Sequence, residues 1–354
     1  MITFSAPKSG NDMTWTVLHD CLDAFVGTTV AVVGDYCLDV ELYADEYAKI
    51  DDRGDRICIQ AANKQSAVGG AGNVAKHLLS LGATVYCFGL VGNDSDGDDI
   101  CLHLARQKAV VTGLVQCEDR KTDCYLRIHT PNGAGSAPFD RACVEYAVAN
   151  TTKTTHEQEA RLCCLLEEKI GLLDGIIIAD MHTEDTAGTL TRNVKDELSR
   201  LAGERLDLPF IVDSRHYLSH YRHMYLKCNT PEFICYTGCA DINSACVPAK
   251  IIELLSGTSA RGLFITAGEN GIRYYRQQCD STDGYGLSAK AIDACGAGDA
   301  ATCGILLGLN TSLAISDVLF LGNLMGCCVV EQQGTGILCP ERIREVYRRI
   351  LTSS

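Results

Sequence analysis

Asp293-Ala294-Cys295-Gly296-Ala297-Gly298-Asp299 is the most informative segment of this sequence. An extended run ends just before it, and an apolar run typical of a helix follows it. Backbone N–H groups at such a helix start suit an anion, and side chains larger than alanine at 296–298 would keep a phosphate away. Asp299 falls in the first helical turn, where it suits a base that takes a proton from a hydroxyl attacking that phosphate. The alternative is an ordinary helix start with an acid favoured by the helix dipole.

Length and charge narrow the classes of fold and ligand. The chain has 354 residues, 46% of them apolar and 21% charged, which is enough for one large α/β domain or two ordinary ones. The formal net charge of -14 argues against nucleic acid and anionic membranes as partners, because both require a basic surface. A ligand that carries phosphate would therefore need helix starts, a few local basic residues or a metal ion.

The 20 cysteines do not follow a metal-binding pattern. There is no CxxC pair, and the nearest cluster, Cys228, Cys235, Cys239 and Cys246, has no histidine partner. Most of the others lie in apolar runs and are expected to behave as small buried hydrophobes. We find no signal-peptide core and no apolar run long enough for a bilayer. A soluble, cytoplasmic protein with reduced cysteines is therefore expected.

Strand-like apolar runs alternate with helical runs along the chain. Residues 175–179 and 210–212 are apolar throughout, and each run is closed by an acid, Asp180 and Asp213. This alternation predicts an α/β fold with a mainly parallel sheet that is covered on both faces. The other expected strands are 29–33, 84–91, 110–115 and 263–266, and the expected helices are 72–81, 97–108, 186–201 and most of 300–351.

Two segments interrupt this alternation. Residues 38–66 are polar with short extended runs, and residues 123–148 alternate like half-exposed antiparallel strands. We expect them to form a small sheet, the lid, over the active-site end of the main domain. Surface hairpins with no role are the alternative. The lid segments are placed at about 38–66 and 117–148, an N-terminal extension at 1–28 and the main domain at 29–350.

Polar residues follow the ends of the expected parallel strands. Ligands of open parallel sheets bind beyond the carboxyl ends of the strands. The 293–299 turn falls at that edge, and so do Asp35, Asp180, Asp213, Asn229 and Thr266. The run Gly69-Gly70-Ala71-Gly72-Asn73 precedes a further helix, where glycine lets a polar ligand reach the backbone and Asn73 offers hydroxyls a donor and an acceptor.

The order of these motifs resembles the ribokinase/PfkB family of carbohydrate kinases over about residues 29–346. The distal DxxGAGD and the proximal GGAGNVA motifs carry the resemblance. Within the family, GDYCLD at 34–39 and VDSR at 212–215 are similar to the heptose-phosphate kinase (HldE kinase domain) branch. The resemblance implies a ribokinase-like three-layer α/β/α fold with a small β lid. It also implies an enzyme that transfers the γ-phosphoryl group of ATP to a hydroxyl of a sugar or sugar phosphate, with a heptose phosphate favoured.

The resemblance implies a role for each motif at the phosphate end. Asp299 matches the catalytic base, and Gly296, Ala297 and Gly298 match the anion hole for the transferring phosphoryl group. Asn229 and Glu232 match the NxxE motif, in which Glu232 holds Mg²⁺ through water; a helix N-cap pair is the alternative. The nucleotide site is expected at Thr266, Gly268, Gly271 and Asn323.

Contacts to the sugar are implied for Asp35, Asp39, Gly69, Gly70, Asn73 and Asp180. Three segments near this pocket depart from the heptose-phosphate kinase pattern, namely 56–60, 130–140 and 181–185. They leave the identity of the sugar open. Two other functions therefore stay open, a nucleoside kinase of the same fold and a catalytically idle relative that binds a sugar or a nucleotide.

The expected partners are a small sugar and ATP with Mg²⁺. A monovalent cation near Asp293 and a homodimer formed through the exposed lid edges are further expectations. Neither nucleic acid nor a membrane is expected. Four basic residues are candidates to bind phosphate, namely Arg120, Arg127, Arg215 and Lys227. Taken singly, however, each is expected to be a solvated surface charge.

Overall fold

A nine-stranded sheet forms the centre of the molecule, with strand order β15-β14-β13-β12-β11-β10-β1-β6-β7. The computed structural model describes residues 13–44, 49–50, 57–58, 61–129, 143–276, 280–284, 286–287, 291–311, 313–332 and 336–353. The strands are β1 (Thr29–Gly34), β6 (Thr84–Gly92), β7 (Val110–Cys117), β10 (Gly175–Asp180), β11 (Phe210–Ser214), β12 (Tyr225–Asn229), β13 (Gly262–Thr266), β14 (Ile272–Tyr275) and β15 (Ser281–Gly284). All pairings from β7 to β13 are parallel, and β14 and β15 are added antiparallel. The predicted mainly parallel sheet is confirmed.

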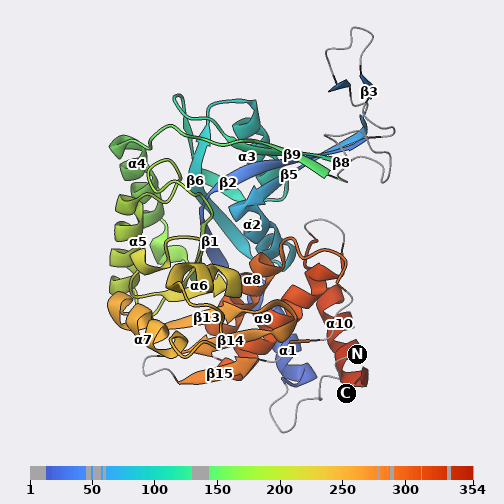
Figure 1. The fold of residues 1–354 in the computed structure, drawn as a ribbon, viewed down its shortest axis with the longest axis vertical. Coiled ribbons are helices and arrows are strands. Elements are labelled where there is room, and N and C mark those ends of the chain that lie inside the picture. The colour runs from blue at the N-terminus through green and yellow to red at the C-terminus, as the bar shows by residue number, and fades with distance from the viewer. Residues whose placement is uncertain are drawn as a thin grey trace.

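Helices cover both faces of this sheet, as Figure 1 shows. One hydrophobic cluster joins the sheet to α1 (Trp15–Phe25), α2 (Ala71–Ser80), α3 (Ser95–Arg106), α8 (Ala297–Asn310), α9 (Ile315–Val330) and α10 (Pro340–Ser353). A second cluster joins the other face to α4 (His156–Glu167), α5 (Arg192–Glu204), α6 (Thr230–Thr237) and α7 (Val247–Thr258). Strands such as β10 are buried along their whole length because both faces are covered. The predicted three layers are therefore present.

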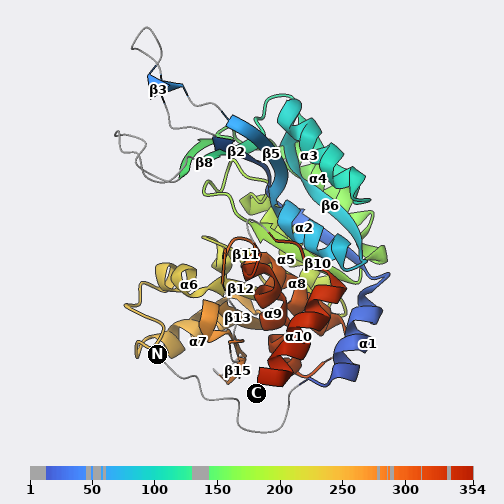
Figure 2. The same ribbon diagram turned by 90° about the vertical axis from the view of Figure 1, so that its right-hand side faces the viewer.

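The lid is a separate four-stranded sheet with the order β5-β2-β8-β9. Its strands are β2 (Tyr36–Ala44), β5 (Ala61–Gly70), β8 (Asp123–His129) and β9 (Cys143–Val148). Figures 1 and 2 show it projecting from the main body. The short strands β3 (Lys49–Ile50) and β4 (Ile57–Cys58) pair with each other. Most of the altered segments 56–60 and 130–140 lie outside the described residues.

One lid pairing differs from the prediction. The pairs β2–β5 and β8–β9 are antiparallel as expected, whereas β2 and β8 are parallel. The reason is topological, because β2 and β8 both enter the lid from the same edge of the main sheet. Alternation along a single strand reports which face is buried and does not report the direction of its neighbour.

Two further expectations need correction. The helix expected over 186–201 begins only at Arg192, because Thr191 is its N-cap and accepts a hydrogen bond from Val194 N at 3.4 Å. The structure pairs Cys239 with Cys246, whereas reduced cysteines were expected throughout.

The predicted N-terminal extension contains α1. Its residues Leu18, Leu22 and Phe25 are buried in the same cluster as α8 and α9, so this helix is part of the folded body. None of the helices in the described part of the chain has the length and apolar character needed to cross a bilayer.

Candidate active site

The 293–299 turn leads directly into α8. Gly296 is the N-cap of this helix and has φ 79°, a left-handed conformation that suits glycine. Ala297, Gly298 and Asp299 form the first turn, where backbone N–H groups have no acceptor within the helix. Within the turn, the Asp293 carboxylate accepts a hydrogen bond from Cys295 N at 2.9 Å. The arrangement is that of an anion-binding helix start.

Asp299 lies half-buried at the end of this turn. Burial raises the pKa of its carboxyl to about 6, and the nearby Asp213 carboxylate adds to the rise. Lys227, Arg215 and a hydrogen bond donated by Asn73 oppose it. A carboxyl with such a pKa is ionised at neutral pH and is still basic enough to accept a proton.

A buried ion pair lies next to the turn. Lys227 Nζ, on β12, is 2.5 Å from Asp213 Oδ2, on β11. A Cβ atom at Gly298 would lie 3.2 Å from the same nitrogen, so the glycine permits the turn to approach the ammonium closely. Burial alone would lower the pKa of Lys227, but Asp213 raises it above its usual value, with help from Asp299 and Glu232. The positive charge is therefore retained beside the anion-binding turn.

The prediction of four solvated basic residues is wrong for two of them. Lys227 is 3% exposed and Arg120 is 6% exposed. Arg120 donates to Thr154 Oγ1 at 3.2 Å, away from the turn, whereas Lys227 lies at the turn. Arg215 is exposed as expected. Arg127 is half-buried on the lid.

Asn229 and Glu232 form a capping box at the start of α6. Asn229 Oδ1 accepts from Glu232 N at 2.8 Å, and Glu232 Oε2 accepts from Asn229 N at 2.8 Å. This is the arrangement named above as the alternative to a metal motif. Only one of the two carboxylate oxygens takes part in these bonds, so the box is compatible with a water-mediated contact to Mg²⁺.

The expected nucleotide loop follows β13. Gly268 and Gly271 have φ 55° and 84°, and Ala267 N donates to Gly271 O at 2.8 Å, so this loop needs glycine at both places. Thr266 pairs in register with Asn229 at the ends of β13 and β12. Asn323 lies on α9, with its Nδ2 3.2 Å from the place of a Cβ at Gly284. The structure thus places Thr266 beside the capping box and Asn323 against β15.

The lid and α2 bring the expected sugar contacts together. Asp39 lies on β2, with its Oδ1 3.3 Å from Arg127 Nη1 on β8. A Cβ at Gly69 would be 2.1 Å from Asp39 Oδ2, so only glycine leaves that carboxylate in place. Gly70 has φ 56° and turns the chain into α2. Asn73 Oδ1 is buried and has no hydrogen-bond partner among the described residues. An orphaned acceptor of this kind suits a ligand hydroxyl.

Asp35 and Asp180 are engaged in structural contacts. Asp35 accepts hydrogen bonds from the backbone N–H groups of Met181, His182 and Thr189, at 3.1, 3.0 and 2.7 Å. It therefore fixes the altered 181–185 segment and the loop that follows it. Asp180 accepts from Ser214 Oγ and Tyr221 Oη, both at 2.8 Å.

Sequence reasoning missed Lys195. This residue is 0% exposed on α5, and its Nζ lies 2.5 Å from Asp185 and 3.6 Å from Asp180. The Tyr217 ring also lies against the ammonium, 3.8 Å from its centroid. The sequence contains only a weak sign that Lys195 is buried, because this residue falls in the apolar stripe of the helix that Leu198 and Leu201 continue.

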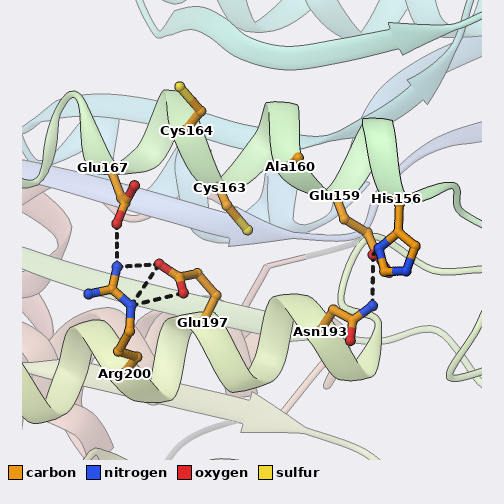
Figure 3. Close-up of a pocket in the computed structure, with 9 residues that line it drawn as sticks. All are labelled: His156, Glu159, Ala160, Cys163, Cys164, Glu167, Asn193, Glu197 and Arg200. Carbon is orange, nitrogen blue, oxygen red and sulfur yellow. Dashed lines mark hydrogen bonds and ion pairs between the residues drawn. The ribbon is translucent and has the colours of Figure 1, made fainter.

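A separate hollow of about 480 Å³ lies between α4 and α5, on the face of the sheet opposite α8. Figure 3 shows that its acidic groups are already paired, with Arg200 bound to Glu167 and Glu197, and Asn193 bound to Glu159. The groups that resemble a phosphoryl-transfer site are all elsewhere, at the carboxyl edge of the sheet.

Comparison with known proteins agrees with this geometry. A model of the pfkB family carbohydrate kinases matches residues 28–342. The bifunctional protein HldE of Bradyrhizobium sp. (strain ORS 278) is 26% identical over 337 residues, which cover 94% of this chain and 65% of that protein. HldE of Helicobacter pylori (strain G27) is 24% identical over 319 residues, covering 89% of this chain and 65% of that protein. The chain thus spans less than two thirds of the length of these relatives.

Solved structures share the fold. Phosphofructokinase-2 from Escherichia coli, in complex with potassium, superposes with a TM-score of 0.70 at 16% identity and covers 92% of this chain and 99% of its own. Ribokinase from Arabidopsis thaliana, complexed with ribose and ATP, gives 0.68 at 14% identity, with 91% and 98% covered. The expected ribokinase-like fold is therefore confirmed. The chain belongs to the pfkB family of carbohydrate kinases, phosphotransferases that act on the hydroxyl groups of sugars.

Proposed function

We propose that this protein transfers the γ-phosphoryl group of ATP to a hydroxyl of a sugar or sugar phosphate, with Asp299 as the base. The observation that carries the proposal is the position of Asp299. Its carboxyl lies in the first turn of α8, beside an anion-binding turn and a buried ammonium, and burial raises its pKa to about 6. An acid that only capped the helix would not need a buried ammonium nearby and an asparagine that donates a hydrogen bond to it.

The proposed reaction uses these groups in one step. The hydroxyl oxygen of the acceptor attacks the γ-phosphorus, the bond from that phosphorus to the bridging oxygen of ADP breaks, and the hydroxyl proton passes to Asp299. The N–H groups of Gly296 and Gly298 would face the negative charge of the transferring group, whereas Ala297 N donates to Ala294 O at 3.3 Å. Lys227 adds a positive charge at the same place, because its ammonium lies beside Gly298.

ATP is proposed to lie between the Thr266–Gly271 loop and Asn323, with its phosphates directed toward Gly298. Glu232 would hold Mg²⁺ through water, and the ion would neutralise phosphate charge that this acidic protein cannot neutralise alone. A monovalent cation near Asp293, a homodimer through the lid and a cytoplasmic location remain predictions of the sequence.

The acceptor is proposed to bind under the lid. Asp39, Asn73 and the backbone at Gly69 and Gly70 would contact its hydroxyls, while Asp35 and Asp180 position the loops around them. A heptose phosphate is the favoured acceptor, since the relatives include bifunctional HldE proteins, but their identity to this chain is only 26% or less in the two compared above.

The test is ADP release from ATP and Mg²⁺ in the presence of hexoses, pentoses, heptose phosphates and nucleosides. We expect release with at least one sugar or sugar phosphate. Release with nucleosides alone would favour a nucleoside kinase. Ligand binding by calorimetry without any ADP release would favour the catalytically idle relative.

A further inference from the structure

Lys76 is a buried lysine in the middle of α2, one turn after Asn73. It is only 7% exposed, and its ammonium forms no hydrogen bond with the described residues. It also forms no ion pair, since no carboxylate oxygen of these residues lies within 4.0 Å of its Nζ. A lysine whose charge is largely removed from water and has no hydrogen-bonded partner is unfavourable, so its burial calls for a reason.

The charged groups around the ammonium include two residues of the proposed acceptor and catalytic sites. The charged groups that act on it are the carboxylates of Asp39 and Asp299, together with the thiols of Cys37 and Cys295. Burial lowers the pKa of Lys76, and the two carboxylates oppose that effect. Helix α2 contacts β2 and β5 of the lid as well as α8, so Lys76 stands where the lid meets the catalytic turn.

The other buried or half-buried cations of this region already have partners. Arg127 contacts Asp39 at 3.3 Å, Glu41 at 3.0 Å and Glu145 at 2.7 Å. Lys227 is paired with Asp213 at 2.5 Å. Lys76 is therefore the buried positive charge in this part of the described chain that is available to a ligand.

A second orphaned group lies beside it. Asn73 Oδ1, three residues earlier on the same face of α2, is buried and has no hydrogen-bond partner among the described residues. The two side chains offer complementary chemistry, since the amide oxygen accepts from a hydroxyl and the ammonium donates to an anion. A neutral sugar would satisfy Asn73 but would place no anion against the ammonium of Lys76.

We propose that Lys76 determines acceptor specificity by binding a negatively charged group, a phosphate or a carboxylate, of the acceptor sugar. This inference rests on the proposed kinase function and adds to it the residue that distinguishes charged from neutral acceptors. Arg127 reduces the electrostatic repulsion between Asp39 and a bound anion, because it forms an ion pair with Asp39.

The experiment compares wild type with Lys76→Met, which keeps most of the length of the side chain and removes its charge. Lys153→Met is the matched control, since Lys153 is exposed. Calorimetry measures the Kd of hexose and heptose monophosphates, of their unphosphorylated parents, of the corresponding sugar acids and of ATP. We expect Lys76→Met to weaken binding of the charged member of each pair by about tenfold or more and to change the parent sugars and ATP little.

Thermal unfolding of the ligand-free protein supplies a second readout. Lys76→Met is expected to unfold at the same or a higher temperature, because it removes an unpaired buried charge. A lysine that merely stabilised the fold would give a lower midpoint. Equal weakening for charged and neutral sugars, or no weakening for either, would overturn the proposal.

ADP release separates this inference from the proposed function. If wild type binds a sugar phosphate through Lys76 but releases no ADP, the inference holds and the proposed kinase activity fails. If wild type phosphorylates a sugar phosphate and Lys76→Met does so equally well, the kinase activity holds and the inference fails.

Discussion

Lys227 Nζ and Asp213 Oδ2 lie 2.5 Å apart in a buried ion pair beside Gly298. The pair joins neighbouring strands β12 and β11 in register, so it couples the sheet to the turn that faces the transferring phosphoryl group. It accounts for how a chain of net charge -14 presents a positive charge at this place.

Lys227→Met should harm both stability and turnover. The substitution leaves the Asp213 carboxylate buried and unpaired, which costs about 3–5 kcal/mol of the free energy of unfolding. Turnover should fall as well, because the charge beside the phosphoryl group is lost. Urea unfolding and ADP release measure the two effects. The double variant Lys227→Met/Asp213→Asn should regain most of the stability without regaining turnover; recovery of both would make the pair purely structural.

The pH dependence of kcat/KM should report Asp299. Its carboxyl must be ionised to accept the proton, and burial raises its pKa to about 6. Activity should therefore rise with pH through about 6 and level off above it. An ordinary aspartate would place this rise at about pH 3.9. Initial rates between pH 5 and 8, at subsaturating acceptor, would show the difference.

Asp180 needs to be separated from Asp299 in that profile, because burial raises its pKa to about 6 as well. Ser214→Ala removes a hydrogen bond that holds the pKa of Asp180 down, so the variant should raise the pKa of Asp180 further. The pH dependence of kcat/KM should be the same in Ser214→Ala as in wild type if Asp299 controls it. A shift to higher pH in Ser214→Ala would assign the profile to Asp180.

Glu232→Gln separates the cap of α6 from metal binding. Glutamine also completes a capping box, so the free energy of unfolding should change by less than about 0.5 kcal/mol. A neutral amide is a poor partner for Mg²⁺ and its water, so the Mg²⁺ concentration for half-maximal rate should rise about tenfold or more. Asn229→Ala is the comparison, since it removes a cap worth about 1 kcal/mol. An unchanged Mg²⁺ dependence in Glu232→Gln would leave the pair as a cap alone.

Much of the fold could be predicted because its signals are local. Strands apolar on every residue, such as 175–179, are stable only between two layers, and small residues at 296–298 have few uses other than a close backbone approach. The parallel pairing of β2 with β8 could not be predicted, because their register depends on contacts between distant segments. The late start of α5 had the same origin, since Asp35 holds Thr189 in the preceding loop.

The charged residues of the site were harder to predict than its glycines. A glycine motif indicates a particular backbone conformation or a close approach to the backbone, and this can be recognised from the sequence alone. Lys76, Lys195 and Lys227 look like ordinary surface lysines there, and only the folded arrangement shows that they are buried. The environment of a charge is a tertiary property, so no local pattern reports it.

The most direct test of the central claim is the turnover of Asp299→Asn. Asp317→Asn is a closely matched control, because Asp317 is also a half-buried acid at the third position of its helix, α9. We expect Asp299→Asn to lower kcat by about 10²–10⁴ while the Kd for ATP stays nearly the same, and Asp317→Asn to behave like wild type. Turnover in Asp299→Asn equal to that of wild type would contradict the assignment of the base and, with it, the proposed site.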